Sequence, residues 1–393
     1  MSQLPAAAAV GDQRDVIPRD KEADAVRLQH VSLTDFRNLE RVVLEVPPPG
    51  LAVIGQNAQG KTNLLEAIYY FQLMRSFRGT RDADVARFGA PGFHIVASIS
   101  GSPRDVPEMS VGFDRQGRRK KVLLNRAQPA RLSEAYGTVP TVMCSPDDRA
   151  LISGAPLLRR RYLDVMLAAV SQRYLFALQQ YRVALVQRNA ALREFSRRRG
   201  DESALAVWEP ALAAHGAIIT VERVAWTAQF REEFARICAA IGEIDPVELS
   251  YATRTDPGNA RRSLTDRLEA TRAADIRRGV THAGPHRDEL RLSLAGREMR
   301  EFASAGQQRT AALALRMLEA LTMLSAQRRY PVLLLDDPFA ELDRVRAGRI
   351  LGLLRDIDPG QTFLCVPRED DIPPELSRLE RSTIAGGNIT PAS

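Results

Sequence analysis

The sequence predicts an α/β fold: an ATPase-like head with a mixed or parallel sheet and a phosphate loop, joined to a mainly helical, arm-like second lobe. Two short apolar runs, residues 51–54 and 332–335, read as buried strands, and each is followed at once by residues that suit a phosphate or metal site. Residues 146–279, between these runs, carry long amphipathic helical patterns. The head is therefore expected to be split in sequence by the helical lobe.

The first strand-like run leads into residues 55–62, a complete G-x-x-x-x-G-K-[ST] phosphate loop, and residues 64–71 continue with helical spacing. Glycines let successive N–H groups turn around phosphate oxygens, and the helix start adds unpaired donors. A glycine turn with a chance Gly-Lys-Thr is the alternative. The phosphate-loop interpretation places Lys61 as a catalytic residue at the β/γ-phosphates and the Thr62 hydroxyl on Mg²⁺. It assigns ATP binding to Gly55, Gln56, Asn57, Ala58, Gln59, Gly60, Lys61, Thr62 and Asn63.

The second strand-like run ends in Asp336 and Asp337. In a parallel sheet such a strand is expected beside the phosphate-loop strand, with its carboxyl end at the nucleotide. Asp336 is then the predicted second ligand of Mg²⁺, and Asp337 the predicted catalytic base that orients and deprotonates water. A strand-end turn is the alternative, because Asp-Asp-Pro is favourable turn chemistry.

Residues 304–308, Ser-Ala-Gly-Gln-Gln, precede a helix rich in alanine and leucine and lie about thirty residues before the acidic strand. This is the order and spacing of the signature motif of ABC-type ATPases, in which a helix N-terminus faces a γ-phosphate. Alone, the motif reads as a good helix N-cap. Residues 341–343, Glu-Leu-Asp, stand where such ATPases place a dimer-contact loop, so Ser304, Gly306 and Gln307 are predicted to bind nucleotide.

The chain of 393 residues carries a formal charge of +7, and its pI near 9.6 favours a polyanionic partner such as DNA. Each basic cluster can also be read as a solvated face; the clusters are residues 118–121, 159–161, 197–199, 261–262 and 277–278. No apolar run is long enough for a membrane helix, and the three cysteines suggest neither disulfides nor zinc. A cytoplasmic protein without a membrane partner is expected.

The domain organisation follows from changes in pattern along the chain. Residues 1–25 read as a disordered extension, residues 26–145 as the first half of the head, residues 146–279 as the helical arm, and residues 280–393 as the second half of the head. Residues 93–125 alternate like antiparallel strands. Residues 163–185 are predicted to form one continuous helical stripe, and residues 208–239 a second long helix.

Several further motifs occur in an order that resembles the RecF family of recombinational DNA repair ATPases, which are ABC-type and related to the structural-maintenance-of-chromosomes proteins. The resemblance extends from about residue 26 to residue 365. It rests on Asp35-Phe36-Arg37-Asn38, residues 145–148, 154–156, 159–164 and 187–192, Trp208, His215-Gly216, and residues 284–290 and 306–309.

The resemblance implies a DNA-binding protein that dimerises head to tail on ATP, so that Ser304 and Gly306 of one copy complete the site holding Lys61 and Asp336 of the other. It further implies binding at DNA gaps and single-strand/double-strand junctions, partnership with RecR and RecO, promotion of RecA loading in DNA repair and replication recovery, and nucleoid association. A nucleotide-sensing scaffold that acts through protein partners, without direct DNA binding, is the alternative function.

By the same resemblance, Arg37 and Asn38 would lie near the base and ribose of ATP; a polar strand turn is the alternative. Residues 365–367 supply no histidine of the kind that contacts the γ-phosphate in many ABC-type ATPases, and Asp337 stands where the wider group usually has glutamate. Slow, weak ATP hydrolysis that resets the dimer is therefore expected. His286 is read as a structural residue.

Overall fold

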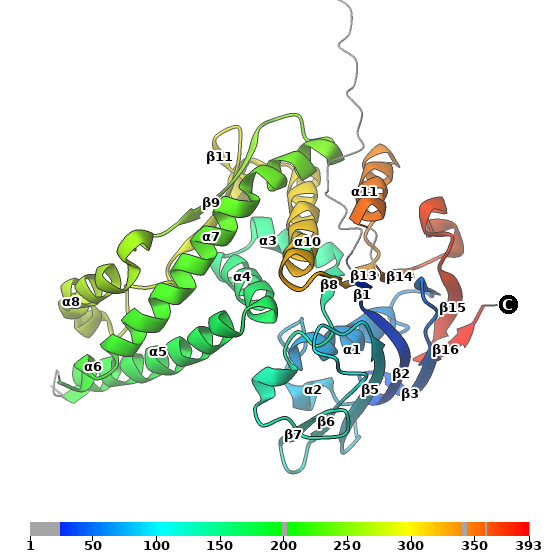
Figure 1. Cartoon of the computed structure of the whole chain (residues 1–393), viewed down its shortest axis with the longest axis horizontal. Coiled ribbons are helices and arrows are strands. Elements are labelled where there is room, and N and C mark those ends of the chain that lie inside the picture. The colour runs from blue at the N-terminus through cyan, green and yellow to red at the C-terminus, as the bar shows by residue number, and fades with distance from the viewer. Residues whose placement is uncertain (1–23, 199–202, 340–343, 358–359, 393) are drawn as a thin grey trace, which may run out of the picture.

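The computed structural model describes residues 24–198, 203–339, 344–357 and 360–392. A head built around two sheets and a projecting helical lobe form the molecule (Figure 1). The predicted dimer-contact loop, residues 341–343, lies outside the described residues, as does almost all of the predicted N-terminal extension. The last two residues of that extension, β1 (Asp24–Ala25), instead form a parallel pair with β12 (Arg329–Tyr330).

A six-stranded mixed sheet carries the phosphate loop. Its order is β16 (Asn388–Pro391), β15 (Glu380–Ala385), β4 (Gly50–Ile54), β14 (Gln361–Val366), β13 (Val332–Asp336) and β8 (Thr141–Cys144). All neighbours are parallel except β15 and β16. The prediction that β13 lies beside β4 is wrong, because β14 separates them. All six residues of β14 are buried, as expected of a central strand covered on both faces.

The second sheet of the head is antiparallel, in the order β3 (Leu39–Glu45), β2 (Arg27–Phe36), β5 (Gly92–Ser100), β6 (Glu108–Asp114) and β7 (Arg119–Leu124). This confirms the alternating strands predicted at residues 93–125. Helix α1 (Lys61–Leu73) packs between the two sheets. Its buried residues share one hydrophobic core with Val332 and Phe363 of the six-stranded sheet. The start of α1 is thereby fixed at the carboxyl edge of β4.

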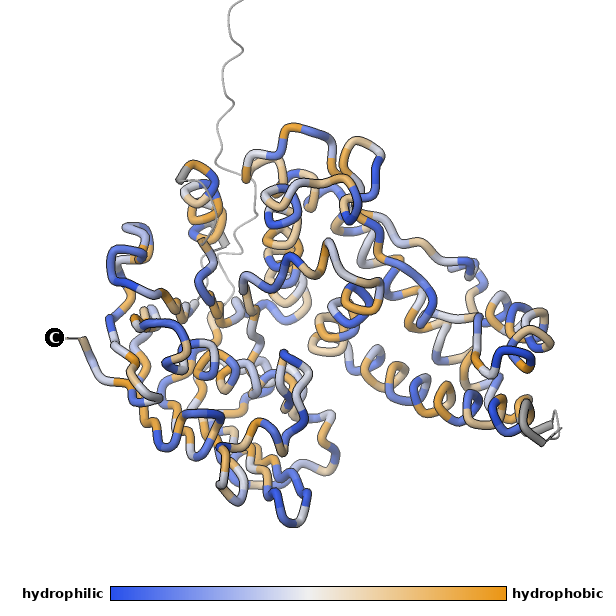
Figure 2. Tube along the Cα trace, turned by 180° about the vertical axis from the view of Figure 1, so that it is seen from behind, coloured by the Kyte–Doolittle hydropathy of each residue, from blue (hydrophilic) through white to orange (hydrophobic). Residues whose placement is uncertain are grey.

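The helical lobe contains four long helices and a small sheet. The helices are α4 (Pro156–Val170), α5 (Gln172–Arg198), α7 (Glu209–Ile241) and α8 (Ala260–Arg278). Hydrophobic and hydrophilic residues alternate along them, as in amphipathic helices (Figure 2). The predicted continuous stripe over residues 163–185 is wrong in one respect: Ser171 is extended and separates α4 from α5. Its hydroxyl accepts a hydrogen bond from the Tyr174 N–H at 3.0 Å, which caps the new helix.

The small sheet consists of β9 (Val247–Ala252), β10 (Glu289–Leu294) and β11 (Arg297–Glu298). Because β10 pairs with β9, the predicted boundary at residue 280 falls inside the helical lobe. The two lobes are joined by α10 (Ala305–Gln327). Its Leu315 carbonyl accepts a bond from the Tyr162 hydroxyl at 2.6 Å, and its Thr322 hydroxyl accepts one from the Trp226 indole at 2.9 Å.

The remaining helices are short or lie at the edges: α2 (Asp82–Val85), α3 (Ala150–Ser153), α6 (Ser203–Ala206), α9 (Met299–Phe302) and α11 (Arg344–Ile357). None of the helices in the described ranges is long and apolar enough to cross a membrane.

Candidate nucleotide site and signature helix

The predicted phosphate loop connects β4 to α1 and opens into a cavity of about 390 Å³. The cavity is lined by Asn57, Ala58, Gly60, Lys61, Thr62, Asn63, Arg78, Pro146, Asp336 and Asp337. The phosphate loop and the acidic strand end therefore meet at one site, although Thr62 and Asp336 lie 274 residues apart in sequence. The Lys61 ammonium donates hydrogen bonds to the carbonyls of Gly55 and Gln56, the latter at 3.0 Å. These carbonyls hold the ammonium at the loop, where a phosphate would compete for it.

Two segments distant in sequence clasp the phosphate loop at Gln59. The Asn38 amide donates to the Gln59 carbonyl at 3.1 Å, and the Asn63 amide donates to the Asn38 oxygen at 2.8 Å. From the turn between β15 and β16, the backbone N–H of residue 386 donates to the Gln59 side chain at 2.7 Å, and that of residue 387 donates to its carbonyl at 3.0 Å. Gly60 has φ +117°, and a Cβ there would approach the Asn38 oxygen at 2.8 Å. Asn38 and this turn thus shape the loop from both sides.

Arg37 does not face the cavity. Its guanidinium forms a bidentate pair with the fully buried Glu66 carboxylate of α1 at 2.7 and 3.0 Å. It also donates to the Thr80 hydroxyl and to the Asp84 carbonyl, each at 2.9 Å. A buried carboxylate is costly without a paired cation, so Glu66 determines where Arg37 points. In this arrangement the Arg37 guanidinium is held by Glu66, and its predicted place near the base and ribose of ATP stays a prediction.

Thr62 and Asp336, the two predicted Mg²⁺ ligands, lie side by side. The Thr62 hydroxyl donates to an Asp336 oxygen at 2.6 Å. Burial raises the pKa of Asp336, while the Thr62 hydrogen bond and the Lys61 charge act in the opposite direction. Mg²⁺ prefers hard oxygen ligands and often takes only one or two from the protein. A hydroxyl and a buried carboxylate side by side at the cavity fit that requirement.

Asp337 lines the same cavity and is held in an uncommon backbone conformation, with φ +44°. Its N–H donates to the Cys365 carbonyl of β14 at 2.9 Å. Burial, and secondarily the nearby Asp371 carboxylate, raise the pKa of Asp337. The carbonyl of the next residue, Pro338, accepts a hydrogen bond at 3.0 Å from Arg309 of α10. Helix α10, which begins with the signature residues 304–308, is therefore hydrogen-bonded to the turn that carries Asp337, the predicted base. The sequence motif did not indicate this contact.

The signature residues lie outside the nucleotide cavity of their own chain. Ser304 is the N-cap of α10, and its hydroxyl accepts from the Gln307 N–H at 3.3 Å while the Gln307 side chain accepts from the Ser304 N–H at 2.9 Å. The helix-cap interpretation is therefore correct locally. The surroundings are nevertheless unusual for a simple cap, because Ser304 is exposed and two large apolar side chains nearby also face solvent: Phe302 is 60% exposed and Ile244 is 95% exposed.

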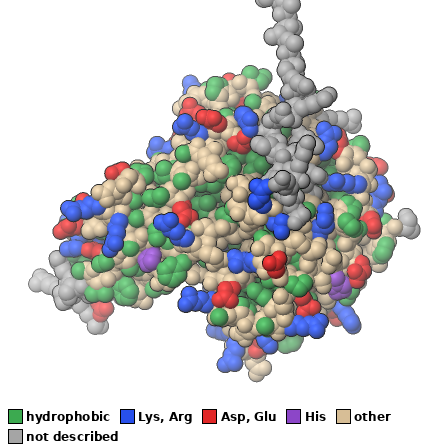
Figure 3. All heavy atoms as spheres, viewed as in Figure 1, with side chains coloured by type: hydrophobic (Ala, Val, Ile, Leu, Met, Phe, Trp, Pro, Cys, Tyr) green, Lys and Arg blue, Asp and Glu red, His purple; other side chains and the backbone are tan. Residues whose placement is uncertain are grey.

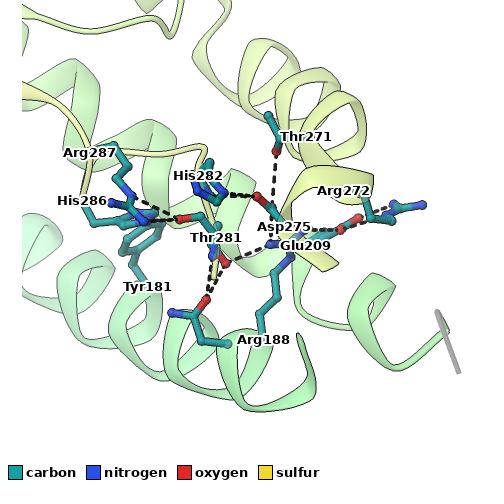
Figure 4. A network of polar contacts seen from close by, with 11 residues as sticks. Tyr181, Arg188, Glu209, Thr271, Arg272, Asp275, Thr281, His282, His286 and Arg287 are labelled. Atoms are coloured by element: carbon teal, nitrogen blue, oxygen red, sulfur yellow. Dashed lines mark hydrogen bonds and ion pairs between the residues drawn. The ribbon is translucent and has the colours of Figure 1, made fainter. Parts of the chain in front are cut away.

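Other motifs that carried the family resemblance build the interior of the helical lobe (Figure 4). The fully buried Arg188 of α5 pairs with Asp275 at 2.7 Å and with Glu209 at 3.0 Å, and donates to the Thr281 hydroxyl at 2.9 Å. The His286 ring lies between the Tyr181 hydroxyl at 2.5 Å and the Thr281 carbonyl at 3.0 Å. The structural interpretation of His286 agrees with this position.

Comparisons with known proteins agree with this arrangement. Residues 27–372 match the RecF/RecN/SMC N-terminal domain family. A Frankia alni protein named DNA replication and repair protein RecF is 36% identical over 385 residues, which cover 94% of this chain and 100% of that protein. A Bacillus subtilis protein of the same name is 33% identical over 359 residues, which cover 89% of this chain and 96% of that protein.

Solved structures show the same fold. A structure described as the recombination mediator protein RecF with ATP in the RecFOR pathway superposes with a TM-score of 0.85 at 26% identity, covering 96% of this chain and 100% of that one. An Smc head bound to the C-terminal winged-helix domain of ScpA superposes with a TM-score of 0.54 at 16% identity, covering 93% of this chain and 97% of that one, which supports the ABC-type head fold alone. The chain therefore belongs to the RecF family, within the wider RecF/RecN/SMC group.

Proposed function

We propose that this protein is an ATP-dependent DNA-binding protein that dimerises head to tail when it binds ATP. The observation that carries the proposal is the separation of the two half-sites within one chain. Lys61 and Asp336 line the cavity, whereas Ser304 and Gly306 lie outside it at an exposed helix N-terminus. A helix N-terminus is an anion site, and a second copy of the chain can bring it to the γ-phosphate. The exposed side chains of Phe302 and Ile244 would be covered in the same step.

Within this composite site each residue has a distinct role. Lys61 and the loop N–H groups would bind the phosphates, and Thr62 and Asp336 would hold Mg²⁺, which neutralises phosphate charge. Asp337 would accept the proton of the attacking water while the water oxygen forms a bond to the γ-phosphorus. The bond between the γ-phosphorus and the oxygen that bridges it to the β-phosphate breaks, and ADP leaves. The aspartate is one methylene shorter than glutamate, which supports slow hydrolysis that resets the dimer. Asn38 supports the loop.

The DNA partner is proposed from the chain's charge and from its relatives. The formal charge of +7 suits a phosphate backbone. The curated relatives are named DNA replication and repair proteins, and the superposed structure is described as a recombination mediator of the RecFOR pathway. By this relationship the protein would bind gaps and single-strand/double-strand junctions, act with RecR and RecO, and promote RecA loading.

Sedimentation velocity tests the proposal directly. The wild-type chain is expected to sediment as a monomer alone and as a dimer with ATP and Mg²⁺, and to bind a gapped duplex only with ATP. Lys61→Ala should remain monomeric at saturating ATP, because it lacks the cation at the β/γ-phosphates. Lys61→Ala that still dimerises would contradict the composite site. DNA binding that is absent, or that does not weaken with salt, would favour the protein-scaffold alternative.

A further inference from the structure

Two further cavities, both lined by α4, lie near the nucleotide cavity, and together they are called the trough. One cavity of about 470 Å³ lies between the end of α1 and helix α4, and a second of about 280 Å³ lies between α4 and α5. Arg75 and Arg161 line both cavities, and Arg78 lines both the larger one and the nucleotide cavity. The three spaces are therefore neighbours in one run. The surface is hollowed between the helical lobe and the head (Figure 3).

The trough contains cationic side chains that have no carboxylate partner among the residues that the structure describes. Within the described ranges, no hydrogen bond or ion pair engages Arg75, and its Nε is buried without a partner. The only described bond of the Arg161 guanidinium is to the Phe77 carbonyl at 3.3 Å, and that of Arg160 is to the Asp288 carbonyl at 3.0 Å. Burial, with the nearby Arg75 charge, lowers the pKa of Arg161. A bound anion would offset the repulsion between the Arg75 and Arg161 guanidinium groups.

The acids that line the trough do not cancel these charges. The Asp148 carboxylate pairs with Arg316 at 2.6 Å, and the Asp164 carboxylate pairs with Arg223 at 2.7 Å and with Arg182 at 3.0 Å. Asp147 is the remaining acid of the two linings, and it is exposed. The net charge facing the trough is therefore positive.

The neighbouring Arg159 shows that this charge is not a general property of the three-arginine run. Arg159 is buried, pairs with Glu289 at 2.6 Å, and donates to the carbonyls of Leu151 and Gly154 at 3.0 and 3.1 Å. Successive residues of a helix point about 100° apart, so α4 turns Arg159 into the protein and Arg160 and Arg161 towards the trough. The run divides into one structural arginine and two that have no carboxylate partner in the described part of the chain.

We propose that this trough binds the phosphates of a single DNA strand, with Arg75, Arg160 and Arg161 as the phosphate contacts. The inference rests on the DNA-binding function proposed above, and it specifies where DNA binds and that a single strand occupies that place. Cavities of 280 to 470 Å³ have the size of small-ligand pockets, which suits the nucleotides of one strand better than a duplex. Proteins that bind single strands combine a positive groove with aromatic surfaces, and the half-buried Phe77 lines the larger cavity.

The segment that follows α1, residues 75–78, is connected to the phosphate loop. The Arg78 guanidinium donates to the Asn63 oxygen at 3.2 Å and lies 3.5 Å from the Glu66 carboxylate, while the Ser76 hydroxyl also donates to Glu66. Asn63 and Glu66 belong to the first turns of α1, directly after Thr62. Rearrangement of the loop around ATP would therefore act on the segment that carries Arg75, which provides a route for ATP-dependent strand binding.

The test compares full-length variants in the presence of ATP and Mg²⁺, by fluorescence anisotropy with a labelled oligothymidylate and a blunt duplex. Arg75→Ala/Arg161→Ala should bind the oligothymidylate about 25-fold more weakly at 0.1 M salt and reduce the slope of log K against log salt by about 1.4, because each single-strand phosphate contact contributes about 0.7. Binding of the blunt duplex should change less than about twofold. Arg75→Lys/Arg161→Lys should retain most of the affinity, because it keeps both charges.

Arg277→Ala is the matched control, because Arg277 is an exposed arginine near the end of α8; it should bind like the wild type. Wild-type affinity and slope in the double alanine variant would overturn the trough assignment while leaving the DNA-binding function standing. An equal loss on blunt duplex would also overturn it, since the arginines would then act through general charge. A wild-type chain that binds no DNA would refute the proposed function itself, and the trough assignment with it.

Equilibrium dialysis with labelled ATP separates a DNA strand from a second nucleotide as the occupant. One ATP per chain is expected for both the wild type and the double alanine variant. Two ATP molecules per wild-type chain, falling to one in the variant, would overturn the assignment to DNA.

Discussion

Replacing Arg188 by leucine should destabilise the helical lobe strongly without touching the nucleotide cavity. The Arg188 side chain is fully buried and pairs with the equally buried Asp275, while its other nitrogen pairs with Glu209 (Figure 4). In Arg188→Leu, Glu209 would keep Arg272 at 2.5 Å. Asp275 would keep bonds from the backbone N–H and the ring of His282 at 3.0 and 2.7 Å, but would lose its guanidinium partner. The uncompensated charge of Asp275 is the main cost.

The expected magnitude follows from that geometry. Removing one partner of a buried ion pair costs about 3–5 kcal/mol of unfolding free energy, because the other charge stays buried. A unit of about 150 to 250 residues loses about 2–4 °C in Tm for each kcal/mol. Arg188→Leu should therefore lower the Tm of the helical lobe by about 6–20 °C, as measured by differential scanning calorimetry. ATP binding at low temperature should be unchanged, since Arg188 does not line the nucleotide cavity.

Arg262→Leu provides the matched control within the same lobe. Arg262 pairs with Asp266 one turn further along α8, but the two side chains are 74% and 56% exposed. Exposed pairs of this kind contribute little, so the Tm should change by less than about 2 °C. If Arg188→Leu and Arg262→Leu gave equal shifts, the reasoning from burial would be refuted, and the network would position its helices without stabilising them.

Three changes test the nucleotide site. Asp337→Asn should slow phosphate release by about 10²- to 10⁴-fold and trap the ATP-bound dimer on DNA, because an amide cannot accept the water proton; hydrolysis at the wild-type rate would place the base elsewhere. Ser304→Arg should abolish dimerisation in sedimentation runs while filter assays still show ATP bound to the monomer, whereas Ser304→Thr keeps the cap and should dimerise. Asp371→Asn removes a charge that raises the pKa of Asp337, so the acid limb of the ATPase pH profile should move to lower pH; an unmoved limb would mean that Asp337 does not set it.

The phosphate loop and the acidic strand were predictable because the residues of each motif are nearly consecutive. A glycine pattern, a lysine and a threonine can be recognised within eight residues, although Asn38 and the turn between β15 and β16 then support the loop from elsewhere in the chain. The neighbour of β13 was not predictable in this way. Strand order depends on which apolar run occupies the middle of the sheet, and the fully buried run of β14 takes that place although it follows β13 in sequence.

Side-chain direction was the second limit of the sequence. The motif at residues 35–38 does not specify where the Arg37 guanidinium points, because Glu66, which lies 29 residues away and is fully buried, decides it. The break between α4 and α5 at Ser171 was not visible in the sequence, because the apolar spacing continues across this single extended residue. For both residues, burial or hydrogen bonding decides a detail that the local pattern leaves open.

The same limit explains why basic clusters predict a polyanionic partner but not its position. Arg159 and Arg161 are equivalent letters in one run, yet the first is neutralised by Glu289 and the second has no carboxylate partner among the described residues. Arg75, which belongs to none of the predicted clusters, has a buried Nε without a hydrogen bond. An arginine paired with a carboxylate inside the protein contributes little to the field that a phosphate meets, whereas one lacking such a partner still requires a counter-ion. On the proposed assignment, unpaired charge in a cavity would indicate the DNA path better than charge density along the chain does.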